Sequence, residues 1–352
     1  MGKRIFLSSD PGIDDMAAIL FALADRDIDL IGIGAVAGNV AMQTALENAR
    51  FTCALAVPSC KVACYEGSSG PLLREQIYGA HKALGLFQDH LVDLESSLPA
   101  VEAGVDNAEN SAALAMAQAI RDAAAMGNPI TFVVTGPMTD LALAMKLAGK
   151  MACLEGIENI VAMGGAFEAL GNRAPYAEMN MLGDPHAARM VCESGIALTL
   201  FPLDATWTCR LTHRDLDQIA REAGLVGQVF ARLFRASDRE NPELYGGPGG
   251  PVHDLLPVVW LVAPELFLTR RSRISVATGP ELAGHTSRVR KKICSDTSSN
   301  EGCTLPHCIA EEVNSDGIRA LFLDHLKSLA QTGRRTKSNK HQSLTNREED
   351  LQ

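Results

Sequence analysis

The sequence lacks a surplus of positive charge, and it lacks any long uninterrupted apolar run. Its 352 residues include 32 Lys and Arg against 42 Asp and Glu, for a formal net charge of −10. A polyanionic partner requires a basic surface, so this balance argues against nucleic acid and anionic membranes as partners. No window reaches the ~18 apolar residues that a membrane-spanning helix requires. The N-terminus also lacks the apolar segment of a signal peptide, so we expect a cytoplasmic protein.

Cysteines at metal-binding spacing are missing as well. The nine cysteines are scattered singly, and none forms the CxxC spacing of a zinc site or a redox motif. Their odd number and scatter also argue against a disulfide framework. We therefore interpret them as reduced thiols in the core or on the surface.

Short apolar runs rich in Ile and Val alternate with longer segments of helical periodicity. With 47% hydrophobic residues, the chain can bury a large core. The short runs predict strands covered on both faces, at 4–9, 28–38, 130–136, 159–165 and 197–204. The segments between them predict helices, at 14–24, 39–56, 110–126, 138–148 and 184–195. This alternation predicts an α/β fold with a doubly wound, mainly parallel open sheet and helices on both faces.

The C-terminal third shows a different pattern. Residues 205–270 are expected to be mostly helical, whereas the basic stretch 271–310 is expected to be irregular. Residues 333–352 contain almost no apolar side chains, which is typical of a disordered tail. We therefore expect one domain over residues 1–332, followed by that tail.

Three carboxylates crowd the end of the first predicted strand. Asp10, Asp14 and Asp15 lie within six positions around the turn residues Pro11 and Gly12. Asp14 and Asp15 fall in the first turn of the predicted helix, where the helix dipole and capping favour acidic side chains. That structural role does not account for Asp10, because neighbouring carboxylates repel one another unless a cation or raised pKa values relieve them. The cluster alone leaves helix capping and a hard-cation site as two alternatives.

Polar residues also stand at the ends of the other predicted strands. Asn39, Thr135, Gly164 and the stretch 204–206 all occupy such positions. Open α/β sheets place their ligand crevice at the carboxyl ends of the strands. The carboxylate cluster is therefore expected to face a binding site.

Six short motifs occur along the chain in a fixed order. They are DPGIDD at 10–15, VAGN at 36–39, TGPMTDLALA at 135–144, MGGAF at 163–167 with GN at 171–172, YAEMNMLGDPHAA at 176–188, and HD at 253–254. In order and approximate spacing they resemble the inosine-uridine preferring nucleoside hydrolases, over about residues 3–270 and more loosely to about 330. The resemblance implies a hydrolase of N-glycosidic bonds that releases ribose and a free purine or pyrimidine base from ribonucleosides. It also implies a homodimer or homotetramer.

The resemblance assigns a role to the crowded aspartates. It implies that Asp10, Asp15 and Asp254, with the backbone carbonyl of Thr135, bind one Ca²⁺. An all-oxygen ligand set suits that hard cation. Asp10 would also take the proton from the attacking water, and the negative site would stabilise the cationic transition state of the sugar.

Further residues are implied to bind ribose or to assist the departure of the base. The ribose-binding set comprises Asp14, Asn39, Asn172, Glu178 and Asn180, and His253 is implied to be the general acid for the base. Taken alone, Asn39 would be interpreted as a turn residue, and Glu178 and Asn180 as parts of a solvated loop. A lone histidine would be interpreted as structural.

Several positions depart from the family pattern. Ser8 stands where the family usually has an aspartate, and Asp140 stands where it usually has Asn. The flap is reduced to something like residues 78–87, with His81 as a weak candidate for its histidine. These departures leave open a catalytically impaired nucleoside-binding or sensing protein. A phosphatase is a further alternative, but no Gly-rich phosphate loop followed by Lys supports it.

The base-contacting wall has four candidates, which are Trp207, Phe230, Phe234 and Tyr245.

Overall fold

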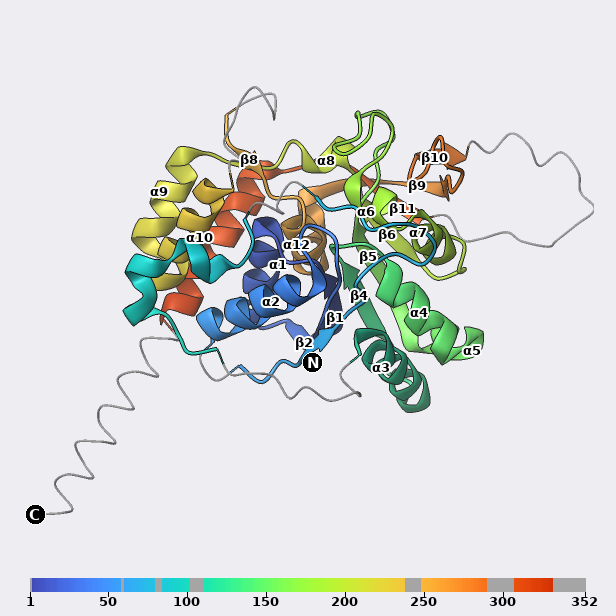
Figure 1. The fold of residues 1–352 in the computed structure, drawn as a ribbon, viewed down its shortest axis with the longest axis horizontal. Helices are drawn as coiled ribbons and strands as arrows, with labels where there is room; N and C mark the ends of the chain where they lie inside the picture. The colour runs from blue at the N-terminus through green and yellow to red at the C-terminus, as the bar shows by residue number, and fades with distance from the viewer. Residues whose placement is uncertain are drawn as a thin grey trace, which may run out of the picture.

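The chain folds around one open sheet whose neighbouring strands come from distant parts of the sequence (Figure 1). This computed structural model describes residues 2–57, 60–79, 84–101, 111–237, 248–289 and 307–331. Within these ranges, the sheet consists of β1 (Lys3–Ser9), β2 (Ile28–Ala35), β3 (Cys64–Glu66), β4 (Ile130–Val134), β5 (Ile157–Met163), β6 (Leu198–Phe201), β9 (Phe267–Val276), β10 (Thr286–Val289) and β11 (His307–Val313). Their spatial order is β10-β9-β11-β6-β5-β4-β1-β2-β3. Pairing is parallel from β3 to β11, and β9 and β10 add an antiparallel edge.

Alternate residues of the central strands point into two hydrophobic cores, one on each face of the sheet. Ile5 and Leu7 of β1 belong to one core, and Phe6 between them belongs to the other. The first core is covered by α1 (Ile13–Ala24), α2 (Met42–Ala56), α9 (His213–Glu222), α10 (Gly224–Ala236) and α12 (Leu255–Val262). The second is covered by α3 (Ala112–Met126), α4 (Thr139–Ala148), α5 (Lys150–Gly156) and α7 (Pro185–Cys192). The predicted doubly wound, mainly parallel α/β fold is confirmed.

Short elements complete the described chain. They are α6 (Met179–Gly183), α8 (Leu203–Thr206), η2 (Phe87–His90), η3 (Val92–Ser97), η4 (Pro264–Leu266) and the two-stranded ribbon of β7 (Arg210–Leu211) and β8 (Gly250–Pro251). For the described residues, the predicted helical character of 205–270 is largely correct, with this ribbon and the start of β9 as exceptions. The helix predicted from residue 39 begins at Met42, after the loop that carries Asn39.

The expectation of irregular structure over residues 271–310 is wrong for the part that the structure describes. β9, β10 and the start of β11 lie there, at the edge of the sheet. Two of the basic residues in these strands pair with Glu311 of β11, which lies 3.0 Å from Arg270 of β9 and 2.8 Å from Arg288 of β10. Charged cross-strand pairs of this kind replace the apolar alternation by which edge strands are usually predicted.

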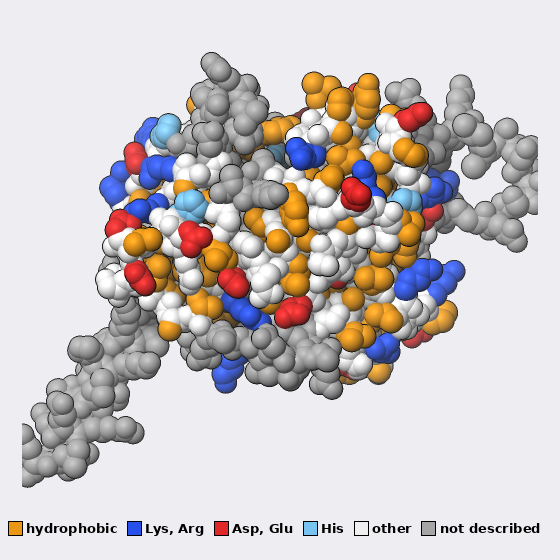
Figure 2. Space-filling view, viewed as in Figure 1, with side chains coloured by type: hydrophobic (Ala, Val, Ile, Leu, Met, Phe, Trp, Pro, Cys, Tyr) orange, Lys and Arg blue, Asp and Glu red, His pale blue; other side chains and the backbone are white. Residues whose placement is uncertain are grey.

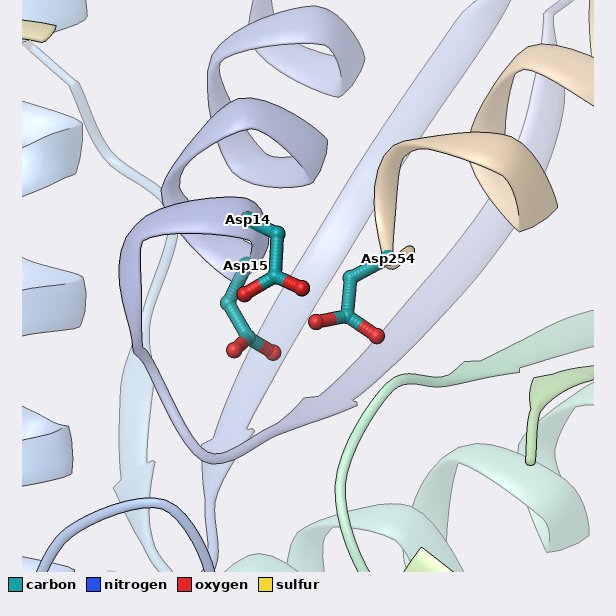
Figure 3. A group of neighbouring side chains, drawn as sticks. All are labelled: Asp14, Asp15 and Asp254. Atoms are coloured by element: carbon teal, nitrogen blue, oxygen red, sulfur yellow. The ribbon is translucent and has the colours of Figure 1, made fainter. Parts of the chain in front are cut away.

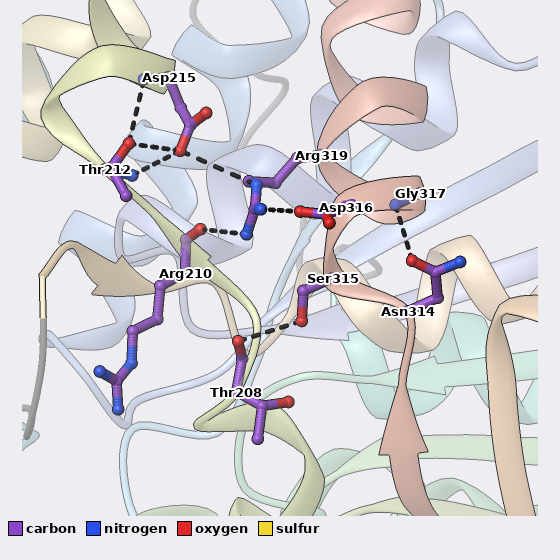
Figure 4. A network of polar contacts seen from close by, with 9 residues as sticks. All are labelled: Thr208, Arg210, Thr212, Asp215, Asn314, Ser315, Asp316, Gly317 and Arg319. Atoms are coloured by element: carbon purple, nitrogen blue, oxygen red, sulfur yellow. Dashed lines mark hydrogen bonds and ion pairs between the residues drawn. The ribbon is translucent and has the colours of Figure 1, made fainter.

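A C-terminal helix over residues 315–331 ties the end of the described chain to its middle. Figure 4 shows Arg319 of this helix beside the segment that follows α8. Its guanidinium donates to the carbonyl of Arg210 at 3.2 Å and pairs with Asp215 at 3.9 Å and with Asp316. Ser315 Oγ donates to the carbonyl of Thr208 at 3.0 Å. These hydrogen bonds connect the C-terminal helix to the segment that leads into β7.

The face of the molecule in Figure 2 carries side chains of both charges. On the face in Figure 2, acidic, basic and apolar side chains are interspersed over the described residues. None of the described helices combines the length and the apolar character that crossing a membrane requires. The predicted disordered tail, 333–352, lies outside the described residues, so the boundary of the domain stays a prediction.

Candidate active site

A tight turn between β1 and α1 brings the N-terminal aspartates to the carboxyl edge of the sheet. Asp10 follows the central strand directly, and Asp14 and Asp15 lie in the first turn of α1. Two loop glycines allow neighbouring segments to approach Asp10 closely. A Cβ atom at Gly38 would lie 2.0 Å from Asp10 Oδ2, and one at Gly136 would lie 2.9 Å from Oδ1. The close packing of these loops around the carboxylate therefore requires glycine at both positions.

Asp15 accepts hydrogen bonds from four donors. Its carboxylate accepts the hydroxyls of Ser9 and Thr135, each at 2.7 Å, and the backbone N–H of Gly12 at 3.0 Å. The side chain of Asn39 donates to it as well, at 3.3 Å. The bond to Gly12 closes the N-terminus of α1, so the capping alternative considered from the sequence holds for Asp15.

A buried acidic cluster forms where Asp254 meets the start of α1. Figure 3 shows the carboxylate of Asp254, at the start of α12, directed toward those of Asp14 and Asp15. One ligand atom from each of the three lies within 4.8 Å of the others, and all three side chains are buried. Burial and then the charges of Asp14, Asp15 and Asp10 raise the pKa of Asp254 well above its ordinary value. Burial and then Asp14 raise the pKa of Asp15 to about 6.

Asp10 lies next to this cluster rather than within it. Its Oδ2 accepts the backbone N–H of Asn39 at 2.5 Å. Burial, followed by the charge of Asp15, raises its pKa well above the ordinary value. The three-carboxylate group of the structure therefore contains Asp14 where the resemblance implied Asp10. The assignment of ligands among these four aspartates stays a prediction.

The chemistry of the donor set fits a hard cation. Oδ1 of Asp10 and Oδ1 of Asp254 are buried and have no hydrogen-bond partner among the described residues. Buried carboxylate oxygens without partners are unfavourable unless a proton or a cation compensates them. Oxygen-only surroundings of this kind suit Ca²⁺ or Mg²⁺ better than a soft transition metal.

A chain of polar contacts links the acidic cluster to the loop before α6. Thr135, which donates to Asp15, accepts the side-chain amide of Asn180 on its carbonyl at 2.7 Å. Glu178 caps α6 and accepts the backbone N–H groups of Asn180 at 2.8 Å and of Gly165 at 3.1 Å. Burial raises the pKa of Glu178 to about 7. Asn172 is exposed and accepts the N–H of Met179 at 2.9 Å. Hydrogen bonds thus connect Asp15 through Thr135 to Asn180 and Glu178, and Asn172 contacts the backbone beside Glu178.

His253 lies beside Asp254 and contacts Thr206, the last residue of α8, and Trp207, which follows it. Its Nδ1 lies 2.7 Å from Oγ1 of Thr206, and its ring meets the ring of Trp207 edge-on, with centroids 5.0 Å apart. His253 is 6% exposed and Thr206 is fully buried. Trp207 was a candidate for the base-contacting wall, and the structure places it against His253. Phe230 and Phe234, also candidates, are fully buried in the hydrophobic core.

Two contacts of the site were not anticipated from the sequence. Ser9 falls within the first predicted strand, and its position beside Asp10 is a usable signal for the contact with Asp15. Thr206 stands at the end of a predicted strand, but the sequence predicts no role for it, because its partner His253 is distant in sequence. Ser8 Oγ is buried and has no hydrogen-bond partner among the described residues. His81 and Tyr245 lie outside the described residues.

The fold and the site define a class of α/β enzyme with a buried acidic site at the carboxyl edge of its sheet. The sequence model of the inosine-uridine preferring nucleoside hydrolases matches residues 5–320. The pyrimidine-specific ribonucleoside hydrolase RihB of Escherichia coli O1:K1 is 34% identical over 282 residues, which are 79% of this chain and 85% of that protein. The chain therefore belongs to the inosine-uridine preferring nucleoside hydrolase family, whose members are enzymes acting on N-glycosyl compounds.

Solved structures agree with this membership. A plant nucleoside hydrolase superimposes with a TM-score of 0.79 at 26% identity, covering 93% of this chain and 99% of its own. The purine-preferring ribonucleoside hydrolase from Gardnerella vaginalis gives a TM-score of 0.78 at 26% identity, covering 94% of this chain and 100% of its own. Because one relative is pyrimidine-specific and this neighbour is purine-preferring, family membership leaves the base open.

Proposed function

We propose that the protein is a calcium-dependent nucleoside hydrolase that releases ribose and a free purine or pyrimidine base from ribonucleosides. The observation that carries the proposal is the buried cluster of Asp14, Asp15 and Asp254, with Asp10 beside it, in a chain of this family. A cluster of carboxylates is suited both to a hard cation and to the positive charge that grows on the sugar as the glycosidic bond breaks.

The cation is proposed to lie among the aspartates and the neighbouring backbone. Asp10, Asp15 and Asp254 would hold it together with the carbonyl of Thr135, and the hydrogen bond from Asn180 already orients that carbonyl. The position of Asp14 makes it a further candidate for this ligand set. When bound, a divalent cation raises the acidity of water and orients hydroxyl groups.

The remaining polar residues are proposed to hold the sugar. Asp14, Asn39, Asn172, Glu178 and Asn180 offer carboxylate and amide groups that can hydrogen-bond to ribose hydroxyls. Such contacts fix the anomeric carbon relative to Asp10 and lower the entropic part of the barrier. Anchoring the sugar that all ribonucleosides share leaves base selection to other residues.

Two residues are proposed to move protons during hydrolysis. Asp10 takes a proton from the attacking water, a role that suits its buried Oδ1, which has no hydrogen-bond partner among the described residues. His253 gives a proton to the departing base. The two groups then act on opposite sides of the sugar, as the displacement of a base by water requires.

A catalytically impaired nucleoside-binding protein is the second candidate. The observation that favours it is Ser8, whose buried hydroxyl has no hydrogen-bond partner among the described residues where relatives are expected to carry a carboxylate. Loss of that charge would weaken the orientation of the neighbouring ligands. Tight binding of a nucleoside, seen by calorimetry without release of ribose, would favour this candidate.

A nucleoside panel assayed with and without chelator tests the proposal. We expect ribose release from uridine, inosine or both, its loss after exhaustive chelation, and its return with Ca²⁺. Elemental analysis is expected to give about one Ca²⁺ per chain. Full activity after chelation, or zinc as the bound metal, would contradict calcium dependence. A cytoplasmic location and a homodimer or homotetramer remain predictions, and light scattering measures the assembly.

A further inference from the structure

The turn after β6 carries a threonine that contacts the ring of His253. Pro202 precedes α8, and Thr206, the last residue of α8, places its Oγ1 2.7 Å from Nδ1 of His253. Thr206 is fully buried and His253 is 6% exposed, so water has little access to this contact. A hydrogen bond is strongest and most directing in such surroundings.

The backbone fixes the spacing between these two side chains. The N–H of Val252, next to His253, donates to the carbonyl of Cys209 at 3.1 Å. Directly beyond this bond, β7 and β8 pair as an antiparallel ribbon. The segments that carry Thr206 and His253 are therefore held in register by the main chain, and the contact does not depend on two mobile side chains.

A second side chain restricts rotation of the His253 ring. Trp207 meets it edge-on, with an angle of 79° between the ring planes. Trp207 itself packs against the small cluster of Met163, Ala166 and Leu203. Because Thr206 occupies one edge of the imidazole and Trp207 lies against the ring, His253 has one defined orientation in the site.

We propose that Thr206 is a positioning residue for His253, holding the Nδ1 edge of the imidazole so that the Nε2 edge meets the departing base. This inference rests on the proposed function. Nδ1–H donates to Oγ1 of Thr206, and this hydrogen bond keeps that proton in place. The proton on Nε2 then passes to the base, and Nε2 keeps the electron pair of the broken N–H bond. The electron pair of the glycosidic C–N bond leaves with the base.

The inference separates Thr206 from the residues that activate water. Thr206 touches neither the aspartates nor the sugar site in the described contacts, and it acts only through His253. Its contribution is therefore expected only when the leaving group needs a proton. Uracil and hypoxanthine are poor leaving groups as anions, whereas p-nitrophenolate leaves readily without protonation.

Kinetics of two substitutions on two substrates test the inference. Thr206→Val keeps the shape of the side chain and removes the hydroxyl, whereas Thr206→Ser keeps the hydroxyl. We expect Thr206→Val to lower kcat for uridine or inosine by about tenfold or more, but by no more than the ~10²–10⁴ that general acid catalysis supplies. We expect its kcat for p-nitrophenyl riboside and both KM values to change by less than about threefold, and Thr206→Ser to match the parent. His253→Ala serves as the reference for complete loss of the acid.

The outcomes separate this inference from the proposed function. If the parent releases ribose from nucleosides and Thr206→Val loses activity equally on both substrates, or loses none, the positioning role is wrong and the proposed function stands. A parent inactive on both substrates would overturn both proposals. A Thr206→Ser variant as impaired as Thr206→Val would show that packing, rather than the hydroxyl, matters.

A measurement without turnover complements the kinetics. Long-range ¹H–¹⁵N NMR of histidine-labelled protein reports which ring nitrogen carries the proton. The His253 signals are assigned by their loss in His253→Ala. We expect the Nδ1 signal of His253 to shift in Thr206→Val and to be restored in Thr206→Ser. Unchanged signals in Thr206→Val would overturn the inference.

Discussion

At the scale of single residues, the aspartates near the site differ in what surrounds them. Asp15 accepts four donors, whereas Asp10 keeps one buried oxygen without a partner among the described residues. Asp254 shares this feature with Asp10, so both keep a buried oxygen that is available to a proton or a cation. Because Asp10 is also the proposed base, its charge is the one that we expect to matter most for turnover.

Asp10→Asn is expected to fold and to lose nearly all turnover. The change removes the group that takes the proton and also weakens cation binding, so the loss should exceed the ~10²–10⁴ typical of a lone general base. Steady-state ribose release from a nucleoside and from p-nitrophenyl riboside measures it, and both substrates should fail. Asp140→Asn is the matched control, because Asp140 is equally buried but contacts Ser68 instead of the acidic cluster. Activity of Asp10→Asn within tenfold of the control would place the base elsewhere.

At the scale of elements, two buried carboxylates fasten the segment 67–79 to the helices beside it. Asp140, in the first turn of α4, accepts both the backbone N–H of Ser68 at 2.9 Å and its hydroxyl at 2.7 Å. Asp184 accepts the N–H of Leu72 at 2.8 Å. At the far end, the N–H of Gly79 donates to the carbonyl of Gly38, directly before Asn39. The segment therefore joins α4 and α7 to the loop that contacts Asp10.

The Asp140 contact predicts a pH dependence of stability. Burial raises the pKa of Asp140 from 3.8 to about 6, although the bonds from Ser68 lower it. Between these values the folded chain keeps a proton that the unfolded chain has lost, so the free energy of unfolding falls as pH rises from about 4 to about 6. At 1.36 kcal/mol per pKa unit, the ionisation of Asp140 lowers the free energy of unfolding by about 3 kcal/mol over this range.

Urea unfolding of the parent and of Asp140→Asn across this pH range measures the effect. Because Asn cannot ionise, the stability of the variant relative to the parent should rise by about 3 kcal/mol between pH 4 and pH 7. Ser68→Ala removes a hydroxyl donor that lowers the pKa of Asp140. The pKa should therefore rise further, and the decline of the free energy of unfolding should extend to higher pH. Parallel curves for the parent and Asp140→Asn would show that this carboxylate does not titrate in the range.

The strands that the sequence predicted correctly lie inside the sheet and pack side chains against both hydrophobic cores. They are β1, β2, β4, β5 and β6, whose short apolar runs are buried because helices pack on either side of them. β10 is the edge strand and β9 lies next to it. There Arg270 and Arg288 pair with Glu311, so apolar periodicity could not find these two strands. In the site, residues that directly follow a strand were predictable. Contacts such as Thr206 with His253 depend on tertiary pairing, which a single sequence does not contain.

At the scale of the whole molecule, the C-terminal helix over residues 315–331 completes the core beneath α1 and α10. Phe322 is fully buried, and its ring packs against that of Phe230 at 5.3 Å. His325 stacks on Phe21 at 4.0 Å between ring centroids, and its Nε2 lies 2.8 Å from Asp25. Residues from the two ends of the described chain therefore share one core, and the α1 that carries Asp14 and Asp15 rests on it.

Two truncations test where the domain ends. Removal of residues 333–352 is expected to leave the unfolding temperature and ribose release unchanged, because a polar segment with almost no apolar side chains contributes little burial. Removal of residues 315–352 is expected to prevent folding. It deletes Ile318, Phe322 and Leu326, all fully buried. At ~2–5 kcal/mol for each large apolar side chain lost, the sum approaches or exceeds a typical total stability of ~5–15 kcal/mol.

Phe322→Ala, costing about 3–5 kcal/mol, should give a folded intermediate case with a lower unfolding temperature. A marked loss of stability on removing residues 333–352 alone would mean that the domain extends into the tail.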